Sequence, residues 1–182
     1  MKEGLLIIDV QNDYFTGGKC ELYQSEKALN AIKELIKYFR ENNLPFFYIQ
    51  HFGQENSSFF VPNTDGVNIH EEIKPLPDEK VIPKNYPNSF LKTDLQDELK
   101  KEGITDLVIC GMMTHMCVDT TTRAASDYGY KVTLISDACA TKDLEWDGIK
   151  IPADVVQNVY MSSLNSTFAD VVTNEEFFNK KN

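Results

Sequence analysis

Apolar residues recur along this chain in two alternating patterns, which are short aliphatic runs and longer stretches with helical spacing. The aliphatic runs predict strands, and the helically spaced stretches predict amphipathic helices. Strands are expected at residues 4–10, 44–50, 80–82, 106–110, 131–135 and 169–173. Helices are expected at residues 25–42, 93–102, 119–128 and 152–166, with a less regular segment at residues 51–77.

Residues at the expected helix ends agree with this assignment. Thr93 is a suitable N-cap, Pro152 suits a helix start, and Gly103 and Gly129 follow expected helix C-termini. Six strands separated by helices predict an α/β fold with a three-layer, doubly wound, mainly parallel six-stranded sheet. A chain of 182 residues without a repeat or linker is expected to form a single domain over residues 1–182.

Composition argues against several classes of function. A net charge of -10 argues against nucleic acid and anionic membranes as partners, because phosphate binding draws on a basic surface. The apolar run at residues 5–8 is ended by Asp9, too early for a signal peptide or a membrane span, so a cytoplasmic location is expected. The 4 cysteines lack C-x-x-C spacing, which predicts reduced thiols.

Chemically useful side chains gather at the carboxyl ends of the expected strands, the edge at which open α/β sheets bind ligands. Asp9 ends the first strand, Lys84 follows the third, and Cys117 follows the fourth. A carboxylate, a lysine and a cysteine are therefore expected to meet at one edge of the sheet.

Each of these residues has a plain structural interpretation beside the chemical one. Asp9 could merely cap a turn, yet a carboxylate at the end of an aliphatic strand also suits base chemistry near neutral pH. Cys117 could be a small buried hydrophobe. In the first turn of the expected helix, however, the backbone N–H groups and the helix dipole would lower the pKa of its thiol. Lys84 could be a solvated surface residue, but next to a thiolate its charge would be stabilising.

Three motifs in order resemble the isochorismatase-like cysteine hydrolases over nearly the whole chain. They are Asp9-Val-Gln-Asn-Asp13, Lys84-Asn-Tyr-Pro-Asn-Ser-Phe90 and Cys110-Gly-Met-Met-Thr-His-Met-Cys117. Within this superfamily, Phe60-Val-Pro-Asn-Thr-Asp-Gly66 and the segment around Lys84 look most like the streptothricin-hydrolase-like amidase branch. The resemblance implies a catalytic triad of Asp9, Lys84 and Cys117 and a cis peptide bond between Met112 and Met113. It also implies an oxyanion hole formed by the N–H groups of Met113 and Cys117.

This resemblance suggests a hydrolase that cleaves a C–N bond through a thioester on Cys117, with Asp9 as the base and Lys84 stabilising charge. Isochorismatases proper hydrolyse a vinyl ether and need no cysteine nucleophile, so Cys117 favours an amide, lactam or carbamoyl substrate. A small planar or cyclic substrate is expected to contact a set of aromatic and polar side chains. These are Phe15, Gln50, His51, Tyr86, Phe90 and Thr114.

Other functions remain open as alternatives. Metal-dependent nicotinamidases carry an Asp-x-His pair near the second strand, whereas this chain has Gln50-His51 and 3 histidines in all, so neither a metal nor a cofactor is expected. His115 as the base of a Cys-His dyad is a weaker hypothesis. A nucleotide-binding protein lacks support because neither glycine-rich phosphate motif occurs. A thiol redox sensor and a catalytically silent scaffold are non-enzymatic alternatives.

The resemblance also implies a homo-oligomer, either a dimer or a tetramer. The helix at residues 152–166 carries a broad apolar stripe, for which core packing is the simpler use. That helix or the cluster Phe59-Phe60-Val61 is expected to contribute to a subunit interface, although the cluster could equally wall the substrate pocket.

Overall fold

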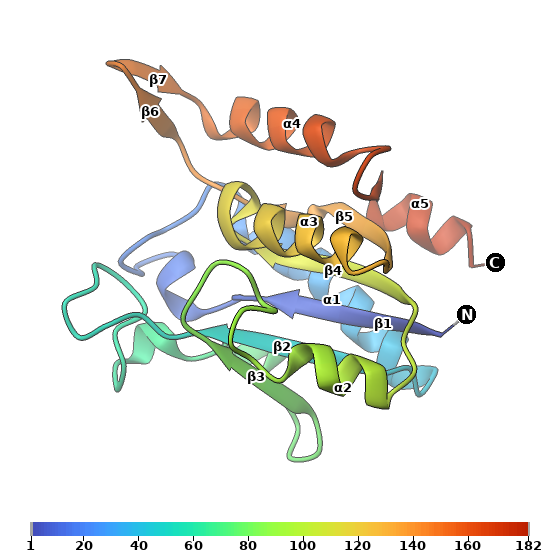
Figure 1. Cartoon of the computed structure of the whole chain (residues 1–182). Helices are drawn as coiled ribbons and strands as arrows, with labels where there is room; N and C mark the ends of the chain where they lie inside the picture. Colours follow the sequence, from blue (N-terminus) through green and yellow to red (C-terminus); the bar gives the residue numbers. More distant parts are fainter. Residues whose placement is uncertain (1, 182) are drawn as a thin grey trace.

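A six-stranded parallel sheet forms the middle layer of the computed structural model, which describes residues 2–181 (Figure 1). Its strand order is β3-β2-β1-β4-β5-β8, and each neighbouring pair is parallel. The strands are β1 (Glu3–Ile8), β2 (Phe46–His51), β3 (Lys80–Lys84), β4 (Asp106–Met112), β5 (Lys131–Ala140) and β8 (Asp170–Val172). The predicted doubly wound α/β fold is confirmed.

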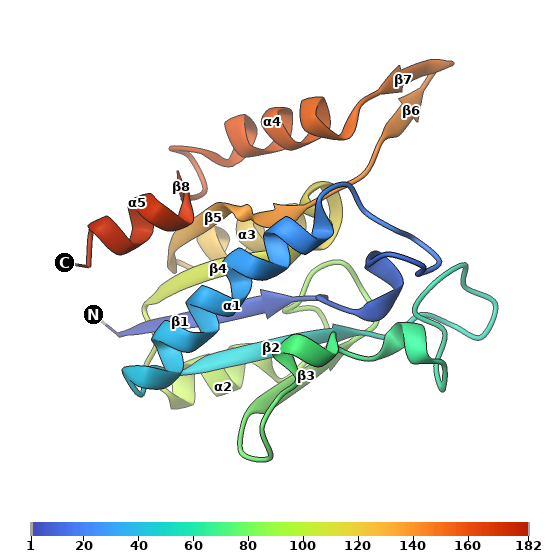
Figure 2. The same cartoon turned by 180° about the vertical axis from the view of Figure 1, so that it is seen from behind.

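Helices cover both faces of this sheet (Figures 1 and 2). The long helix α1 (Ser25–Glu41) lies on one face, together with the short C-terminal helix α5 (Asn174–Asn179). Helices α2 (Leu95–Lys101), α3 (Asp119–Asp127) and α4 (Ala153–Leu164) belong to the opposite side. Within residues 2–181, every helix is too short or too polar to span a bilayer.

Burial on two sides explains the uninterrupted apolar runs in the central strands. Along β1, Leu5 and Ile7 pack into the core on the α1 side, whereas Leu6 and Ile8 pack into the core on the α2 and α3 side. All four side chains are at most 1% exposed. The strand is thus anchored from both faces, and its carboxyl end is held in a fixed position.

Several elements differ from the sequence-based prediction. The helix predicted at residues 93–102 begins at Leu95 with Asp94 as the N-cap. Thr93 lies just before it, where its hydroxyl donates to the Ser89 carbonyl and accepts from the Leu95 N–H. Strand β5 continues to Ala140, since a bulge lets its second half pair again with β4. The prediction also missed α5 and an antiparallel hairpin of β6 (Leu144–Trp146) and β7 (Ile149–Ile151). Such three-residue strands are too short to give a clear periodicity.

Gly111 of β4 is paired with Ile8 of β1 and lies against its backbone. Its φ is +128°, and a Cβ atom there would lie 2.1 Å from the Ile8 carbonyl oxygen. Any other residue would therefore push β4 away from β1, directly before the turn that carries Cys117. This glycine sets the distance between the strands that bring Asp9 and Cys117 together.

We expect Gly111→Ala to destabilise the fold by at least about 1–3 kcal/mol, the usual cost of one strained backbone position. Gly103→Ala is the matched control, because Gly103 also has positive φ (+67°) but has no heavy atom within 4 Å of the added Cβ. Urea unfolding followed by circular dichroism measures both values. Equal losses of stability in the two variants would show that the contact with Ile8 is unimportant.

Candidate active site

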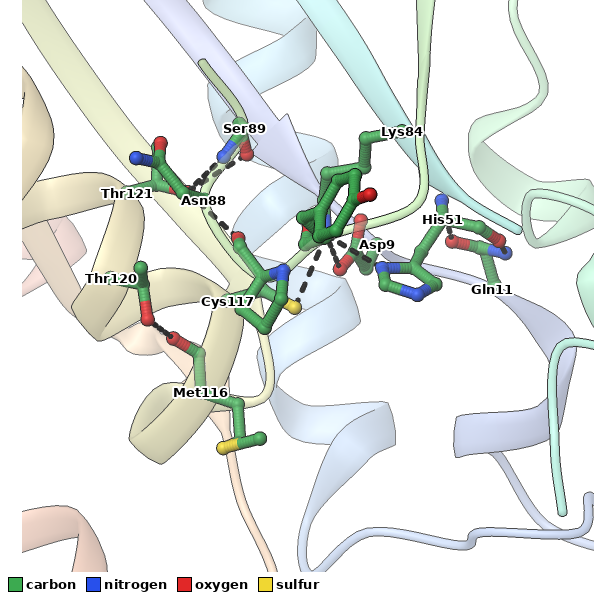
Figure 3. A network of polar contacts seen from close by, with 12 residues as sticks. Asp9, Gln11, His51, Lys84, Asn88, Ser89, Met116, Cys117, Thr120 and Thr121 are labelled. Carbon is green, nitrogen blue, oxygen red and sulfur yellow. Dashed lines mark hydrogen bonds and ion pairs between the residues drawn. The ribbon is translucent and has the colours of Figure 1, made fainter. Parts of the chain in front are cut away.

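Asp9, Lys84 and Cys117 meet at the carboxyl edge of the sheet, although they come from three separate segments (Figure 3). Asp9 directly follows β1, Lys84 is the last residue of β3, and Cys117 lies in the turn between β4 and α3. Their exposed fractions are 0%, 1% and 5%, respectively. The three groups therefore interact in a region that is largely closed to water, where charge interactions are strong.

The Asp9 carboxylate is fixed by the unusual backbone that follows β1. Its φ is +52°, a left-handed conformation that aspartate tolerates better than most residues. The backbone N–H of Asp9 donates to the Ile49 carbonyl oxygen of β2 at 3.0 Å. Oδ2 lies 2.8 Å from the Lys84 ammonium, whereas Oδ1 has no hydrogen-bond partner among residues 2–181. One carboxylate oxygen is thus available to receive a proton.

The ammonium group of Lys84 lies at the centre of the site. Its Nζ atom is 2.8 Å from Asp9 Oδ2, 2.9 Å from His51 Nδ1 and 3.2 Å from Cys117 Sγ, and it also donates to the Tyr86 carbonyl oxygen. Burial lowers the pKa of this amine, but Asp9 and Cys117 raise it more, so the net pKa is above its usual value. Lys84 therefore carries its positive charge at neutral pH.

His51 is the fourth member of the cluster. Burial and the neighbouring Lys84 ammonium lower the pKa of its ring, so the imidazole is neutral near pH 7 and Nδ1 can accept from Lys84. Ligand atoms of Asp9, His51 and Cys117 lie within 4.8 Å of one another, as they do around many metal ions. Here the ammonium of Lys84 contacts all three side chains, so this chain supplies its own cation at their centre.

Cys117 lies in a π-helical turn, Thr114–Val118, and not in the first turn of α3 as predicted. The predicted lowering of its pKa is also wrong. Burial and the Asp9 carboxylate raise the pKa of the thiol by more than Lys84 lowers it, so the pKa lies above its ordinary value. The resting group is a neutral thiol, and attack on a substrate requires transfer of its proton to a neighbouring base.

The predicted cis peptide bond lies in the backbone before Cys117. The peptide bond between Met112 and Met113 is cis, and it joins the end of β4 to the π-helical turn. The Met113 carbonyl accepts from the N–H groups of Met116 and Val118, which fixes the start of this turn. Met113 and Cys117 are thereby held on one short, hydrogen-bonded segment.

The structure brings some of the predicted substrate contacts to this cluster and leaves others elsewhere. His51 and the backbone carbonyl of Tyr86 contact Lys84. Half-buried Gln50 lies next to His51 in β2, but its side chain donates to the Val67 carbonyl. Phe90 lies at the far end of α3, where its ring packs against Tyr128. That position argues against a direct substrate contact by Phe90.

Two other predicted contacts are buried and already engaged. Phe15 is 4% exposed and packs against the ring of His70. Thr114 is fully buried, and its hydroxyl donates to Gln157 Oε1 of α4 at 2.7 Å. His115, the weaker candidate base, contacts the Thr141 hydroxyl instead of the thiol.

Sequence reasoning missed three residues that position the site. Gln11, fully buried, donates to the carbonyls of His51 and Val67 and accepts from the His51 N–H, which fastens the end of β2 beside β1. Asp13 accepts from the Phe60 N–H and so fastens the irregular segment at residues 52–77. Gln157 links Thr114 to the Ser136 carbonyl of β5. Their only sequence signal is a polar residue next to a strand end or on a helix.

The aromatic cluster at Phe59 and Phe60 lies over the same end of the sheet. Phe60 is 1% exposed, its ring centroid is 4.6 Å from that of Tyr14, and it is 6.0 Å from that of His51. Phe59 packs against Tyr14 as well. These rings are part of the core beside His51, which leaves little of Phe60 for a subunit interface.

Comparison with known proteins gives one consistent result. Residues 3–176 match the isochorismatase domain family. An uncharacterized isochorismatase family protein of Bacillus subtilis, YddQ, is 46% identical over 97% of this chain and 99% of its own length. A streptothricin hydrolase of Streptomyces noursei is 32% identical over 78% of this chain and 56% of its own length. The crystal structure of a putative isochorismatase hydrolase from Oleispira antarctica superposes with a TM-score of 0.94 at 41% identity, covering 98% of this chain and 96% of that one.

The raised pKa of Cys117 predicts that iodoacetamide labels this residue slowly at neutral pH. Because the thiolate reacts, the rate should rise about tenfold per pH unit without levelling off below pH 9. Peptide mass spectrometry separates Cys117 from the other cysteines, and an unstructured cysteine peptide provides the reference profile. A plateau below pH 8 would show that the thiol is already ionised in the resting protein.

Proposed function

Because this chain belongs to the isochorismatase family of hydrolases, we propose that it cleaves a C–N bond in a small amide, lactam or carbamoyl compound with Cys117 as the nucleophile. The observation that carries this proposal is the buried contact of a thiol, a carboxylate and an ammonium group at Cys117, Asp9 and Lys84. The similarity to a streptothricin hydrolase supports hydrolysis as the class of reaction. The buried thiol beside a carboxylate and an ammonium group supports a cysteine nucleophile over vinyl ether cleavage.

The first half of the reaction forms a thioester. Asp9 takes the proton from Cys117 Sγ while the sulfur forms a bond to the substrate carbonyl carbon, and the carbonyl π electrons move onto its oxygen. The backbone N–H groups of Met113 and Cys117 stabilise this oxyanion. When the intermediate collapses, the C–N bond breaks and the leaving nitrogen takes the proton from Asp9.

The second half returns the enzyme to its starting state. Asp9, again a carboxylate, takes a proton from water while the water oxygen attacks the thioester carbon. The C–S bond then breaks, the sulfur takes the proton back from Asp9, and the carboxylic or carbamic product leaves. Atoms and charge balance, and the thiol is neutral at the start and the end of the cycle, in agreement with its raised pKa.

Lys84 stabilises the charged partners without moving a proton. Its ammonium lies 2.8 Å from the Asp9 carboxylate and 3.2 Å from the sulfur, so it favours each negative charge as it forms. Nδ1 of the neutral His51 ring accepts a hydrogen bond from Lys84, which leaves Nε2 to contact a substrate. Tyr86 lies beside Lys84 and is 39% exposed, so its ring suits a small substrate with a flat apolar part.

We expect Cys117→Ala and Asp9→Asn to lower kcat/KM by roughly 10³-fold or more, as in other enzymes whose nucleophile and base act as a unit. Release of ammonia or amine from a panel of amides, lactams and carbamoyl compounds measures the rate. Cys20→Ser is the matched control, because Cys20 lies outside this cluster and is also a free cysteine. Full turnover by Cys117→Ala would contradict the assignment, and circular dichroism checks that each variant is folded.

The same enzyme is expected to release no pyruvate from isochorismate, because vinyl ether hydrolysis makes no use of a thiol nucleophile. Coupling to lactate dehydrogenase detects pyruvate directly. Pyruvate release that survives in Cys117→Ala would favour an isochorismatase instead. The absence of turnover on every substrate, together with rapid reversible oxidation of Cys117, would favour a redox sensor.

A further inference from the structure

Tyr14 is a buried aromatic residue beside the site, and its hydroxyl is unpaired. It ends the 3₁₀ turn η1 (Asn12–Tyr14), which follows Asp9 at the carboxyl edge of the sheet, and its N–H donates to the Gln11 carbonyl at 3.0 Å. The side chain is 1% exposed. Within residues 2–181, its hydroxyl forms no hydrogen bond. A buried hydroxyl left unpaired costs free energy, so a native protein rarely keeps one without a use.

The hydroxyl of Tyr14 still borders open space. Among residues 2–181, fully enclosed side-chain oxygens without a partner occur at Asp9, Thr122 and Asn174. The Tyr14 oxygen is not enclosed in this way, so the little surface that this residue exposes lies at its hydroxyl. A ligand that enters the site can therefore reach this oxygen.

Neighbouring groups place Tyr14 against the reactive cluster. Its ring centroid is 4.6 Å from that of Phe60, which in turn lies 6.0 Å from that of His51. Burial raises the pKa of the phenol most, and the next largest contributions, from Asp9 and Cys117, raise it further. Tyr14 is therefore protonated at neutral pH, and it lies close to the base and the nucleophile of the proposed reaction.

The Asp9 carboxylate decides which way this hydroxyl points. A negative charge attracts the hydrogen of a nearby O–H group and repels the lone pairs of its oxygen, so hydroxyl dipoles turn in such a field. In the proposed reaction, the backbone N–H groups of Met113 and Cys117 bind the oxyanion. Tyr14 is then a free hydrogen-bond donor for a second acceptor on the substrate.

We propose that the Tyr14 hydroxyl donates a hydrogen bond to the substrate and selects compounds with a second acceptor close to the amide that is cleaved. Imides and cyclic ureides have such an acceptor in a second carbonyl group, whereas simple lactams and aliphatic amides lack it. Tyr14 is thus a specificity-determining residue. This inference rests on the proposed function and extends it to the class of substrate.

Tyr14→Phe removes only the hydroxyl, and matched pairs of compounds within the amide panel test its role. Succinimide and 2-pyrrolidinone form such a pair, because they are rings of equal size with and without the second carbonyl group. The variant should lose roughly tenfold or more in kcat/KM on succinimide, because the second acceptor is left unpaired in a closed site. On 2-pyrrolidinone, which has no such acceptor, kcat/KM should change by less than about threefold.

Tyr48→Phe is the matched control, because Tyr48 is also 1% exposed but its hydroxyl accepts from Arg40 near the end of α1 at 3.2 Å. This variant should keep the wild-type ratio of the two rates. In urea unfolding followed by circular dichroism, Tyr48→Phe should have a lower midpoint than the wild type, since it loses a hydrogen bond. Tyr14→Phe loses none, so its midpoint should not fall.

An equal loss of kcat/KM on both compounds, or no loss on either, would overturn the inference while Cys117-dependent turnover leaves the proposed function intact. A wild type that cleaves only compounds with a single carbonyl group would overturn it as well. A lower unfolding midpoint in Tyr14→Phe would do the same, because the hydroxyl would then have a partner within the protein. Absence of Cys117-dependent turnover would overturn the proposed function itself, and this inference with it.

Discussion

The ion pair between Asp9 and Lys84 is the interaction on which the arrangement of this site depends. Both side chains are fully buried, and their charged atoms are 2.8 Å apart. Removing either partner would leave an unpaired charge in the core, at a cost of about 3–5 kcal/mol. The fold can hold such a pair only because the strand ends that carry it are fixed, and the pair in turn keeps a charged lysine beside a thiol.

The pairing register of the strands places Asp9 and Lys84 at the same edge of the sheet. Lys84 is paired with His51 between β3 and β2, and Ile8, the residue before Asp9, is paired with Ile49 between β1 and β2. Gly111 lets β4 approach β1 so closely that the turn with Cys117 reaches the same edge. The site therefore results from the alignment of strands of unequal length, and the polar clamps at Gln11 and Gln157 maintain it.

The sequence was sufficient to predict the sheet, the three reactive side chains and the edge at which they meet. Aliphatic runs locate buried strands, and parallel strands place their carboxyl ends together. The protonation state of Cys117 could not be predicted in the same way, because it depends on how deeply the thiol is buried and how close Asp9 lies. The roles of Phe15, Phe90 and Thr114 were equally beyond sequence, since each depends on which neighbour the side chain meets. The hairpin of β6 and β7 was missed because three-residue strands show no usable periodicity.

The way in which Asp13 and Gln11 hold the irregular segment bears on how this protein could be re-engineered. Within this segment the two side chains bind main-chain groups, the Phe60 N–H and the Val67 carbonyl, and Gly66 lies so near Asp13 that a Cβ would be 2.2 Å from Oδ1. Side chains of this segment that are exposed and make no contact with the rest of the molecule are separate from these attachments, unlike the core residues Phe60, Val67 and Ile73. A designer could randomise its exposed positions to select a new substrate preference while the catalytic apparatus stays intact.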